Sequence, residues 1–251
     1  MRVFAFLMLP LAAHAVELKP QTDQFYSSYF DNYERRLQSR EHFLLIDAID
    51  GTRQRVRSGE LSIREHLASK EPPGGLIHHW DGAVFLPRVA VTEVIAFVQN
   101  YDNHKNIYKP EVVDSKLLSR EGSDFRIRMR LLKKKILTVV LETEHHVRYR
   151  QLDEKRWESI SRSTKVAEVD SAGSRKEKEL RPGTGHGFLW RTDSLWRFLE
   201  ADGGVYMECS TISLSRDVPL GLTRIIRPIL NDLPEESLRS ILTKTRDGLK
   251  R

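Results

Sequence analysis

The chain of 251 residues contains a single cysteine, Cys209, so no disulfide can form within it. Its stability must therefore come from the core alone. A lone cysteine in a strand-like stretch is usually a small buried apolar residue rather than a nucleophile. The sequence also lacks the HExxH and Cys/His spacings of metal sites, the GxSxG elbow of hydrolases and the phosphate-binding P-loop. The recognised sequence motifs of those enzyme and metal-site classes are thus missing.

A strong charge of one sign is missing too. The 41 Lys and Arg residues stand against 35 Asp and Glu residues, and the net charge is only +6. A large basic excess favours anionic partners, whereas a small one distributed along the chain does not. No nucleic-acid-binding signature is present, so nucleic acid is not an expected partner. Arg126, Arg128 and Arg130 share one face of a predicted strand, which leaves a transient contact with a membrane surface open.

Long hydrophobic runs are confined to the start of the chain. Residues 1–15, MRVFAFLMLPLAAHA, combine one basic residue, an apolar stretch and the small-residue pattern AHA. This arrangement is typical of a secretory signal peptide, with cleavage expected after Ala15. The apolar run is shorter than the roughly 20 residues that span a bilayer. We therefore expect an exported, soluble, periplasmic protein.

The clearest boundary in the chain is KEPPGG at residues 70–75, because two prolines and two glycines interrupt any regular element. Residues 16–75 show amphipathic helical patterns and are predicted to form a mostly helical N-terminal extension, with one short strand in GELSIREHL. The main domain is expected to cover residues 76–251.

Strand patterns dominate the first part of the main domain. In FRIRMRL at residues 125–131, apolar and basic residues alternate, which predicts a half-buried antiparallel strand. KKK at 133–135 is expected in the solvent-exposed connection to the next strand, and DGG at 202–204 is typical of a tight hairpin. From Leu220 the apolar residues recur at helical spacing. This order predicts an α+β fold, in which a twisted antiparallel sheet is covered by the long C-terminal helix.

Residues 91–118 place a polar cluster, YDNHKNIYKP, directly after an apolar helical stretch. Thr92 is predicted to cap that helix, and the Asp and Asn residues suit its termination. Pro110 favours an extended start for the following strand. The cluster is therefore interpreted as a turn whose His and Tyr side chains lie at the mouth of a pocket. Replacement of His104 by Ala is expected to leave the fold intact.

Four features occur in a characteristic order. They are a strand ending at Pro87, the segment TEVIAFVQNYDNHKNIYKPEV, a late hairpin WRFLEADGGVYMECSTISL, and a long helix after Pro219. In this order residues 76–251 resemble the START / polyketide-cyclase (SRPBCC) superfamily, which has the helix-grip fold. They also resemble exported bacterial members of unknown function. The resemblance implies a deep cavity between the sheet and the C-terminal helix that holds a hydrophobic small molecule or lipid. It implies no common set of catalytic residues.

We therefore expect a non-catalytic binding protein, with no cofactor and no catalytic residue. One alternative is a cyclase- or hydrolase-like enzyme acting on a lipid- or polyketide-like substrate in the same cavity. Another is an envelope interaction protein whose cavity is filled by side chains. The residues predicted to contact the ligand are His104, Tyr108, Ile127, Met129, Val139, Leu141, His145, Tyr149, Trp190, Trp196, Glu208, Ile226 and Ile229.

No metal site is expected. The neighbouring histidines His78-His79 and His145-His146 lie in predicted strands, where adjacent side chains point to opposite faces. Two neighbours therefore cannot readily hold one ion. Each pair is expected to contain one partly buried and one exposed histidine.

Overall fold

The computed structural model describes residues 17–66, 71–134, 138–217 and 223–250, with only the backbone for 223–232. The predicted signal peptide lies outside these residues. The described chain forms one antiparallel sheet with the strand order β1-β2-β9-β8-β6-β5-β4-β3, and β7 pairs only with β6. The strands are β1 (Ser62–His66), β2 (Gly75–Pro87), β3 (Val112–Glu121), β4 (Asp124–Lys134), β5 (Thr138–Gln151), β6 (Arg156–Asp170), β7 (Lys178–Glu179), β8 (Arg191–Ala201) and β9 (Gly204–Arg216).

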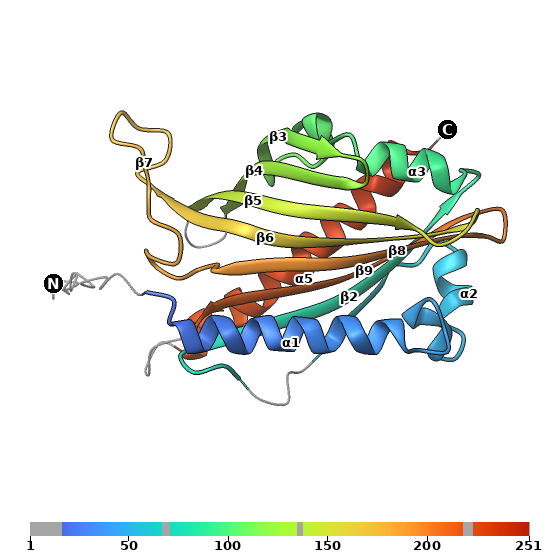
Figure 1. Ribbon diagram of the computed structural model, residues 1–251, viewed down its shortest axis with the longest axis horizontal. Helices are drawn as coiled ribbons and strands as arrows, with labels where there is room; N and C mark the ends of the chain where they lie inside the picture. The colour runs from blue at the N-terminus through green and yellow to red at the C-terminus, as the bar shows by residue number, and fades with distance from the viewer. Residues whose placement is uncertain (1–16, 67–70, 135–137, 218–222, 251) are drawn as a thin grey trace, which may run out of the picture.

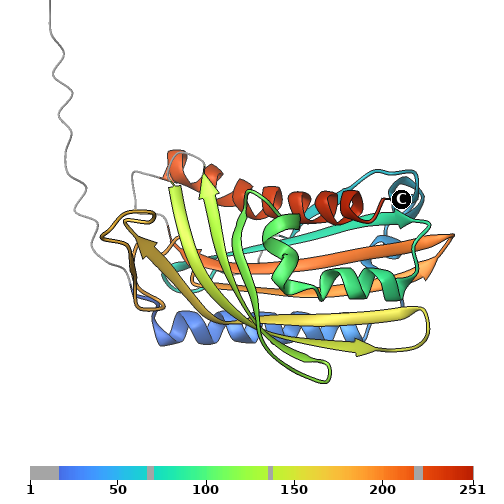
Figure 2. The same ribbon diagram turned by 90° about the horizontal axis from the view of Figure 1, so that it is seen from above.

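Helices cover both faces of the sheet. Figure 1 shows α1 running across the sheet on the side of the viewer, and Figure 2 shows α5 on the opposite side. The helices are α1 (Pro20–Gln38), α2 (Thr52–Arg57), α3 (Val91–Val98), α4 (His104–Ile107) and α5 (Thr223–Gly248), with short 3-10 turns η1 (Leu45–Ala48) and η2 (Tyr101–Asn103). The antiparallel sheet and its C-terminal helix confirm the predicted α+β helix-grip architecture. Among the described helices, none is both long enough and apolar enough to cross a membrane.

The face under α1 is a filled core. Tyr26, Phe30, Tyr33 and Leu37 recur along one stripe of α1 and are each at most 3% exposed. They pack with Trp190, Ile212 and Leu214 from the sheet side. Each large side chain removed from water contributes roughly 1.5–3 kcal/mol. The helix α1 thus shares a core with the main sheet, and β1 extends that sheet by pairing with β2.

The opposite face is covered by α5, which lies close to β2. A Cβ at Gly82 would lie 2.7 Å from Leu242 Cδ1 and 2.9 Å from Leu238 Cδ2, so only glycine permits this approach. Leu238 and Leu242 are buried against β2 and β9. Because α5 packs against β2 and β9, it leaves space above the strands that lie farther along the sheet.

The segment 91–118 is the turn predicted from the sequence, because α3, η2 and α4 lead directly into β3. The prediction that Thr92 caps α3 is wrong. The helix begins at Val91. The N–H of Ala90 donates to Glu93 Oε2 at 2.9 Å, so the Glu93 carboxylate provides a hydrogen-bond acceptor at the N-terminal end of the helix.

Two further local predictions have different outcomes. The hairpin at 202–204 is confirmed, with positive φ angles of 56° at Asp202 and 81° at Gly203. Lys133 was expected in solvent, but its Nζ donates to Ser237 Oγ of α5 at 2.6 Å. The last residues of β4 lie beneath the C-terminal helix, so Lys133 is drawn into a polar contact there.

Candidate functional site

A cavity of about 330 Å³ lies between the sheet and α5. Its volume is in the range of small-molecule sites, which begins at about 300 Å³. Much of the apolar part of its wall comes from β4, β5, α3 and α5 and includes Val98, Ile127, Met129, Leu131, Val139, Leu141, Val147, Leu233, Leu238 and Ile241. A void of this size argues against the alternative in which side chains fill the interior.

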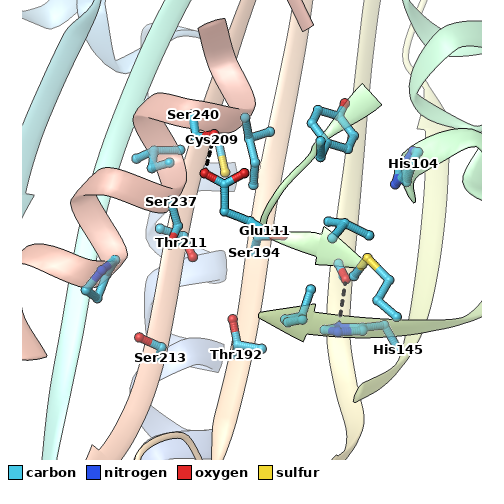
Figure 3. A pocket seen from close by; sticks show the side chains of 18 of the residues that line it. His104, Glu111, His145, Thr192, Ser194, Cys209, Thr211, Ser213, Ser237 and Ser240 are labelled. Carbon is cyan, nitrogen blue, oxygen red and sulfur yellow. Dashed lines mark hydrogen bonds between the residues drawn. The ribbon is translucent and has the colours of Figure 1, made fainter. Parts of the chain in front are cut away.

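A second part of the wall carries hydroxyl groups. Alternate residues of three neighbouring strands face the cavity, because strand side chains alternate between the two faces. Register places Ser194 of β8 opposite both Thr211 of β9 and Ser161 of β6, so the hydroxyls form adjoining rows. Figure 3 shows four of them side by side on β8 and β9. The set consists of Ser159, Ser161, Thr192, Ser194, Thr211 and Ser213.

Charged groups gather where β4 and the start of β3 meet α5. Ser240 donates to Glu111 Oε1 at 3.0 Å (Figure 3), and Lys244 pairs with the other carboxylate oxygen. Burial opposes ionisation of Glu111, but the Lys244 ammonium holds its pKa below the ordinary value. Burial also lowers the pKa of Lys133, which is bonded to Ser237. This end of the cavity is therefore polar, and its charges have partners.

His145 is a polar group in an otherwise apolar section of the wall. It is 5% exposed, its Nδ1 lies 3.4 Å from Ser161 Oγ, and its buried Nε2 has no hydrogen-bond partner. Burial lowers the pKa of His145 to about 4, so the imidazole is neutral at pH 7. A ligand with a donor or acceptor atom can satisfy Nε2, since a neutral imidazole offers one of each.

His104 and Tyr108 line the cavity but are held by the protein itself. His104 Nε2 donates to the carbonyl oxygen of Val98 at 3.0 Å, and burial lowers the pKa of His104 to about 4. Tyr108 OH shares a hydrogen bond of 3.0 Å with Thr245 Oγ1, and burial raises the pKa of Tyr108 to about 12. The two rings form part of a fixed wall, whereas the sequence suggested that they lie at the mouth of the pocket.

Tyr149 is fixed in the same way. Its hydroxyl lies 2.8 Å from that of Tyr101, and burial raises the pKa of both phenols. Cys209 also lines the cavity, and burial raises the pKa of its thiol well above the ordinary value. The thiol is therefore protonated at neutral pH and is unsuited to act as a nucleophile.

Comparison with solved structures places this architecture. A STAR-related lipid transfer protein from Xanthomonas axonopodis matches with a TM-score of 0.51 and 16% identity, over 74% of this chain and 99% of that chain. This chain has the START / polyketide-cyclase (SRPBCC) fold. The lipid transfer and protein localization domain of human StarD13 (8% identity, 80% and 96% covered) and the Zhui aromatase/cyclase from Streptomyces sp. R1128 (14%, 69% and 93%) match with TM-scores of 0.47 and 0.46. At these identities the likeness concerns the fold alone. No protein-family model and no curated protein matches the sequence.

Within this helix-grip cavity the structure brings together most of the residues predicted to contact a ligand. The wall includes His104, Tyr108, Ile127, Met129, Val139, Leu141, His145, Tyr149 and Trp196. Their contact with a ligand stays a prediction. The side chains of Ile226 and Ile229 lie outside the described residues.

Glu208 was expected in the cavity and instead faces the other side of the sheet. Its two carboxylate oxygens accept the N–H groups of Leu45 and Ile46 at 2.8 and 3.1 Å. Burial raises the pKa of Glu208 to about 8, yet the group is not available to a guest in the cavity. In β9 the odd-numbered residues face the cavity, and Glu208 has the wrong parity for it.

Trp190 is likewise misplaced by the sequence. It packs under α1 with Ile212, Leu214 and their neighbours, and its backbone N–H donates to the carbonyl oxygen of Leu214 at 2.7 Å. The strand β8 begins only at Arg191, and the positive φ angle of Gly187 belongs to the preceding loop. Strand parity therefore does not apply to Trp190, and Phe188, two residues earlier, lines the helix-grip cavity instead.

The hydroxyl rows are the part of this helix-grip site that the sequence analysis missed. Their signal was present as alternate small polar residues, in TDS at 192–194 and in STIS at 210–213. Such spacing also occurs on solvent-facing strands. Only the position of the C-terminal helix turns these residues toward an interior space.

Proposed function

We propose that this protein binds a hydrophobic small molecule or lipid in the cavity between its sheet and α5, as a carrier or sensor without catalytic activity. The observation that carries this proposal is the cavity of about 330 Å³ with its largely apolar wall. The description of the Xanthomonas axonopodis structure as a lipid transfer protein is in keeping with this class of ligand.

The residues that line the cavity also indicate the chemistry of the ligand. Apolar residues from β4, β5 and α5 face the hydroxyl rows of β6, β8 and β9 across the cavity. A guest with hydrocarbon on one side and oxygen or nitrogen atoms on the other satisfies both surfaces, because buried polar groups need hydrogen-bond partners. His145 Nε2 has no partner within the described protein and is the site where such an atom gains most.

The main experiment uses native mass spectrometry on purified protein, before and after delipidation, and measures rebinding of a fluorescent fatty-acid probe. Thr211→Phe places a large ring in the cavity and is expected to lower probe affinity at least about tenfold, a change of 1.4 kcal/mol. Val113→Phe adds the same ring at a position that is 49% exposed and serves as control.

Two results would contradict the proposal. In the first, wild-type protein carries no guest and binds no probe. In the second, Thr211→Phe is folded and retains the affinity of Val113→Phe. The circular dichroism spectrum and urea midpoint of both variants establish that they are folded, so that a loss of binding reports on the cavity.

A second candidate function is an enzyme that acts on a lipid- or polyketide-like substrate in the same space. The observation in its favour is His145, a buried neutral imidazole whose Nε2 is without a partner. A neutral histidine within reach of a bound substrate can accept a proton. The variant His145→Phe separates the two functions. A carrier keeps most of its affinity for an apolar probe, whereas an enzyme keeps binding but loses turnover.

We also propose export through the segment 1–15. N-terminal sequencing of the protein isolated from its host is expected to begin at Val16, and an intact Met1 would contradict this.

A transient membrane contact remains a proposal for Arg126 alone among the three alternating arginines. Arg128 pairs with Asp114 at 2.8 Å, and Arg130 pairs with Glu177 at 2.9 Å.

A further inference from the structure

A compact group of possible metal ligands lies on the α1 face of the sheet, away from the cavity. It consists of His66 on β1 with His79 and Asp81 on β2, and their donor atoms all lie within 4.8 Å of one another. His66 is directly opposite His79 in the strand register, and Asp81 follows two residues later on the same face. The adjacent histidine pairs rejected as metal sites in the sequence are therefore not the relevant ones. Neighbouring strands bring a different pair together.

The burial of both His78 and His79 was not foreseen. His78 is 6% exposed and His79 is 1% exposed, so the expectation that one of them faces solvent is wrong. Helices cover both faces of β2, which buries both histidines. On the other pair the expectation is correct, since His145 is buried whereas the side chain of His146 is 41% exposed.

His79 is oriented as a metal ligand would be. Its Nδ1 lies 2.9 Å from the hydroxyl of Tyr29 on α1, and its Nε2 has no hydrogen-bond partner. Nε2 lies 3.7 Å from Asp81 Oδ1. An imidazole held through one nitrogen while the other is open is the usual arrangement around a metal ion.

Asp81 is the anionic member of the group. Its carboxyl group is buried, with the residue 6% exposed. Tyr33 OH and Ser210 Oγ both donate to Oδ1, at 3.1 and 2.6 Å, and His66 Nε2 contacts Oδ2. The carboxylate is thus charged, buried and fixed in direction.

We propose that His66, His79 and Asp81 bind a divalent transition-metal ion such as Zn²⁺ beneath α1. Two imidazole nitrogens and one carboxylate oxygen are ligands that Zn²⁺ takes at about 2.0–2.2 Å. An ion at these distances requires donors about 3–4 Å apart, so the His66–Asp81 contact opens while the more distant donors close in slightly around the ion. The His66 side chain is 26% exposed and gives the ion a route from solvent to a fourth, open coordination position.

One neighbouring cation opposes this ion. The Arg64 NH2 group lies 3.3 Å from Asp81 Oδ2 and 3.3 Å from His66 Nε2. Its side chain is 46% exposed, so it can turn outward into solvent when the ion binds. Removal of the guanidinium is therefore expected to strengthen metal binding, an effect that adventitious binding at other histidines would not show.

The bound ion would tie the edge strand to the rest of the fold. His66 belongs to β1, His79 and Asp81 belong to β2, and Tyr29 and Tyr33 connect the group to α1. This site is independent of the cavity and of its guest, because it lies on the other face of the sheet.

The experiment is a titration of metal-free, full-length protein with Zn²⁺ by isothermal calorimetry, and with Co²⁺ followed by visible absorption. We expect one ion per chain and a higher unfolding temperature in its presence. His66→Gln, at a partly exposed edge-strand position, is expected to lower affinity at least about tenfold. His79→Gln is expected to do the same, and Arg64→Gln is expected to raise affinity. His146→Gln is the control, since that histidine pairs with Asp124 at 2.7 Å on another strand.

The proposal fails if the wild-type protein binds neither ion. It also fails if His66→Gln and Arg64→Gln bind Zn²⁺ as the wild type does, which would indicate an adventitious ion only. Should His79→Gln not fold, His66→Gln and Arg64→Gln still decide the question.

Discussion

β9 presents Ser210, Ile212 and Leu214 to the face under α1, and Thr211 and Ser213 to the face under α5. Under α1 the space is filled by the large rings of Tyr26, Phe30 and Tyr33. Under α5 the small hydroxyl side chains of the same strand border an open volume of about 330 Å³. One strand thus forms half of a packed core and half of a cavity.

The difference arises from how each helix meets the sheet. Along α1, aromatic residues on one stripe reach into the sheet and leave no room. On the other side α5 is seated on Gly82 of β2 through Leu238 and Leu242, and the cavity lies over the strands beyond it. The α5 face therefore combines a packed core, which includes Phe125, Leu238 and Leu242, with the cavity, whereas the aromatic residues of α1 fill the face beneath them.

The largest expected effect comes from truncating one side chain on each face of the sheet. Phe30→Ala removes a fully buried ring and is expected to lower the free energy of unfolding by about 3–5 kcal/mol, because a cavity replaces packed contacts. Met129→Ala removes a side chain that already borders empty space and is expected to cost clearly less. Urea denaturation of both variants measures the difference. Equal losses would mean that the two faces are packed alike.

A second test uses the acid buried on the α1 face. Burial raises the pKa of Glu208 to about 8 from an ordinary 4.5, so the folded protein holds this proton more tightly than the unfolded chain does. The associated stability is fully present below about pH 4.5 and is lost as the pH rises through 8. Over this window the slope is at most about 1.4 kcal/mol per pH unit.

The variant Glu208→Gln removes this titration. Its urea midpoint is expected to change less between pH 5 and pH 8 than that of the wild type. Glu154→Gln replaces an exposed acid and serves as control. A wild-type slope that persists in Glu208→Gln would show that another group is responsible.

The smallest expected effect concerns His104 on the cavity side. The sequence suggested that replacement by Ala leaves the fold intact, but the structure shows a buried ring bonded to Val98 and packed against Tyr101 and Tyr108. His104→Ala is expected to lower the free energy of unfolding by about 1–3 kcal/mol, since the Val98 carbonyl loses its donor. Thermal unfolding measures this. An unchanged unfolding midpoint would show instead that the fold tolerates replacement of His104, as the sequence suggested.

The predictable parts of the molecule were those with a strong local pattern. The alternation in FRIRMRL identified β4, the DGG sequence identified the β8–β9 turn, and the amphipathic pattern within residues 16–75 indicated the helix α1. The wrong predictions concern residues whose neighbours in the sequence do not show which face of the sheet the side chain occupies. Glu208 lies in a strand buried on both faces, so its flanking residues did not show which side it occupies. Trp190 precedes its strand and follows no strand parity.

By itself, the sequence determined the order of strands and helices, the apolar stripes and the turn at residues 91–118, because each depends on residues close together along the chain. The tertiary structure decided which face of each strand borders a cavity, since that depends on where α1 and α5 lie. It also decided that His66, His79 and Asp81 converge, because strand register alone brings β1 against β2. Such sites arise from the pairing of strands that are distant in the sequence, and the pattern of neighbouring residues does not reveal that pairing.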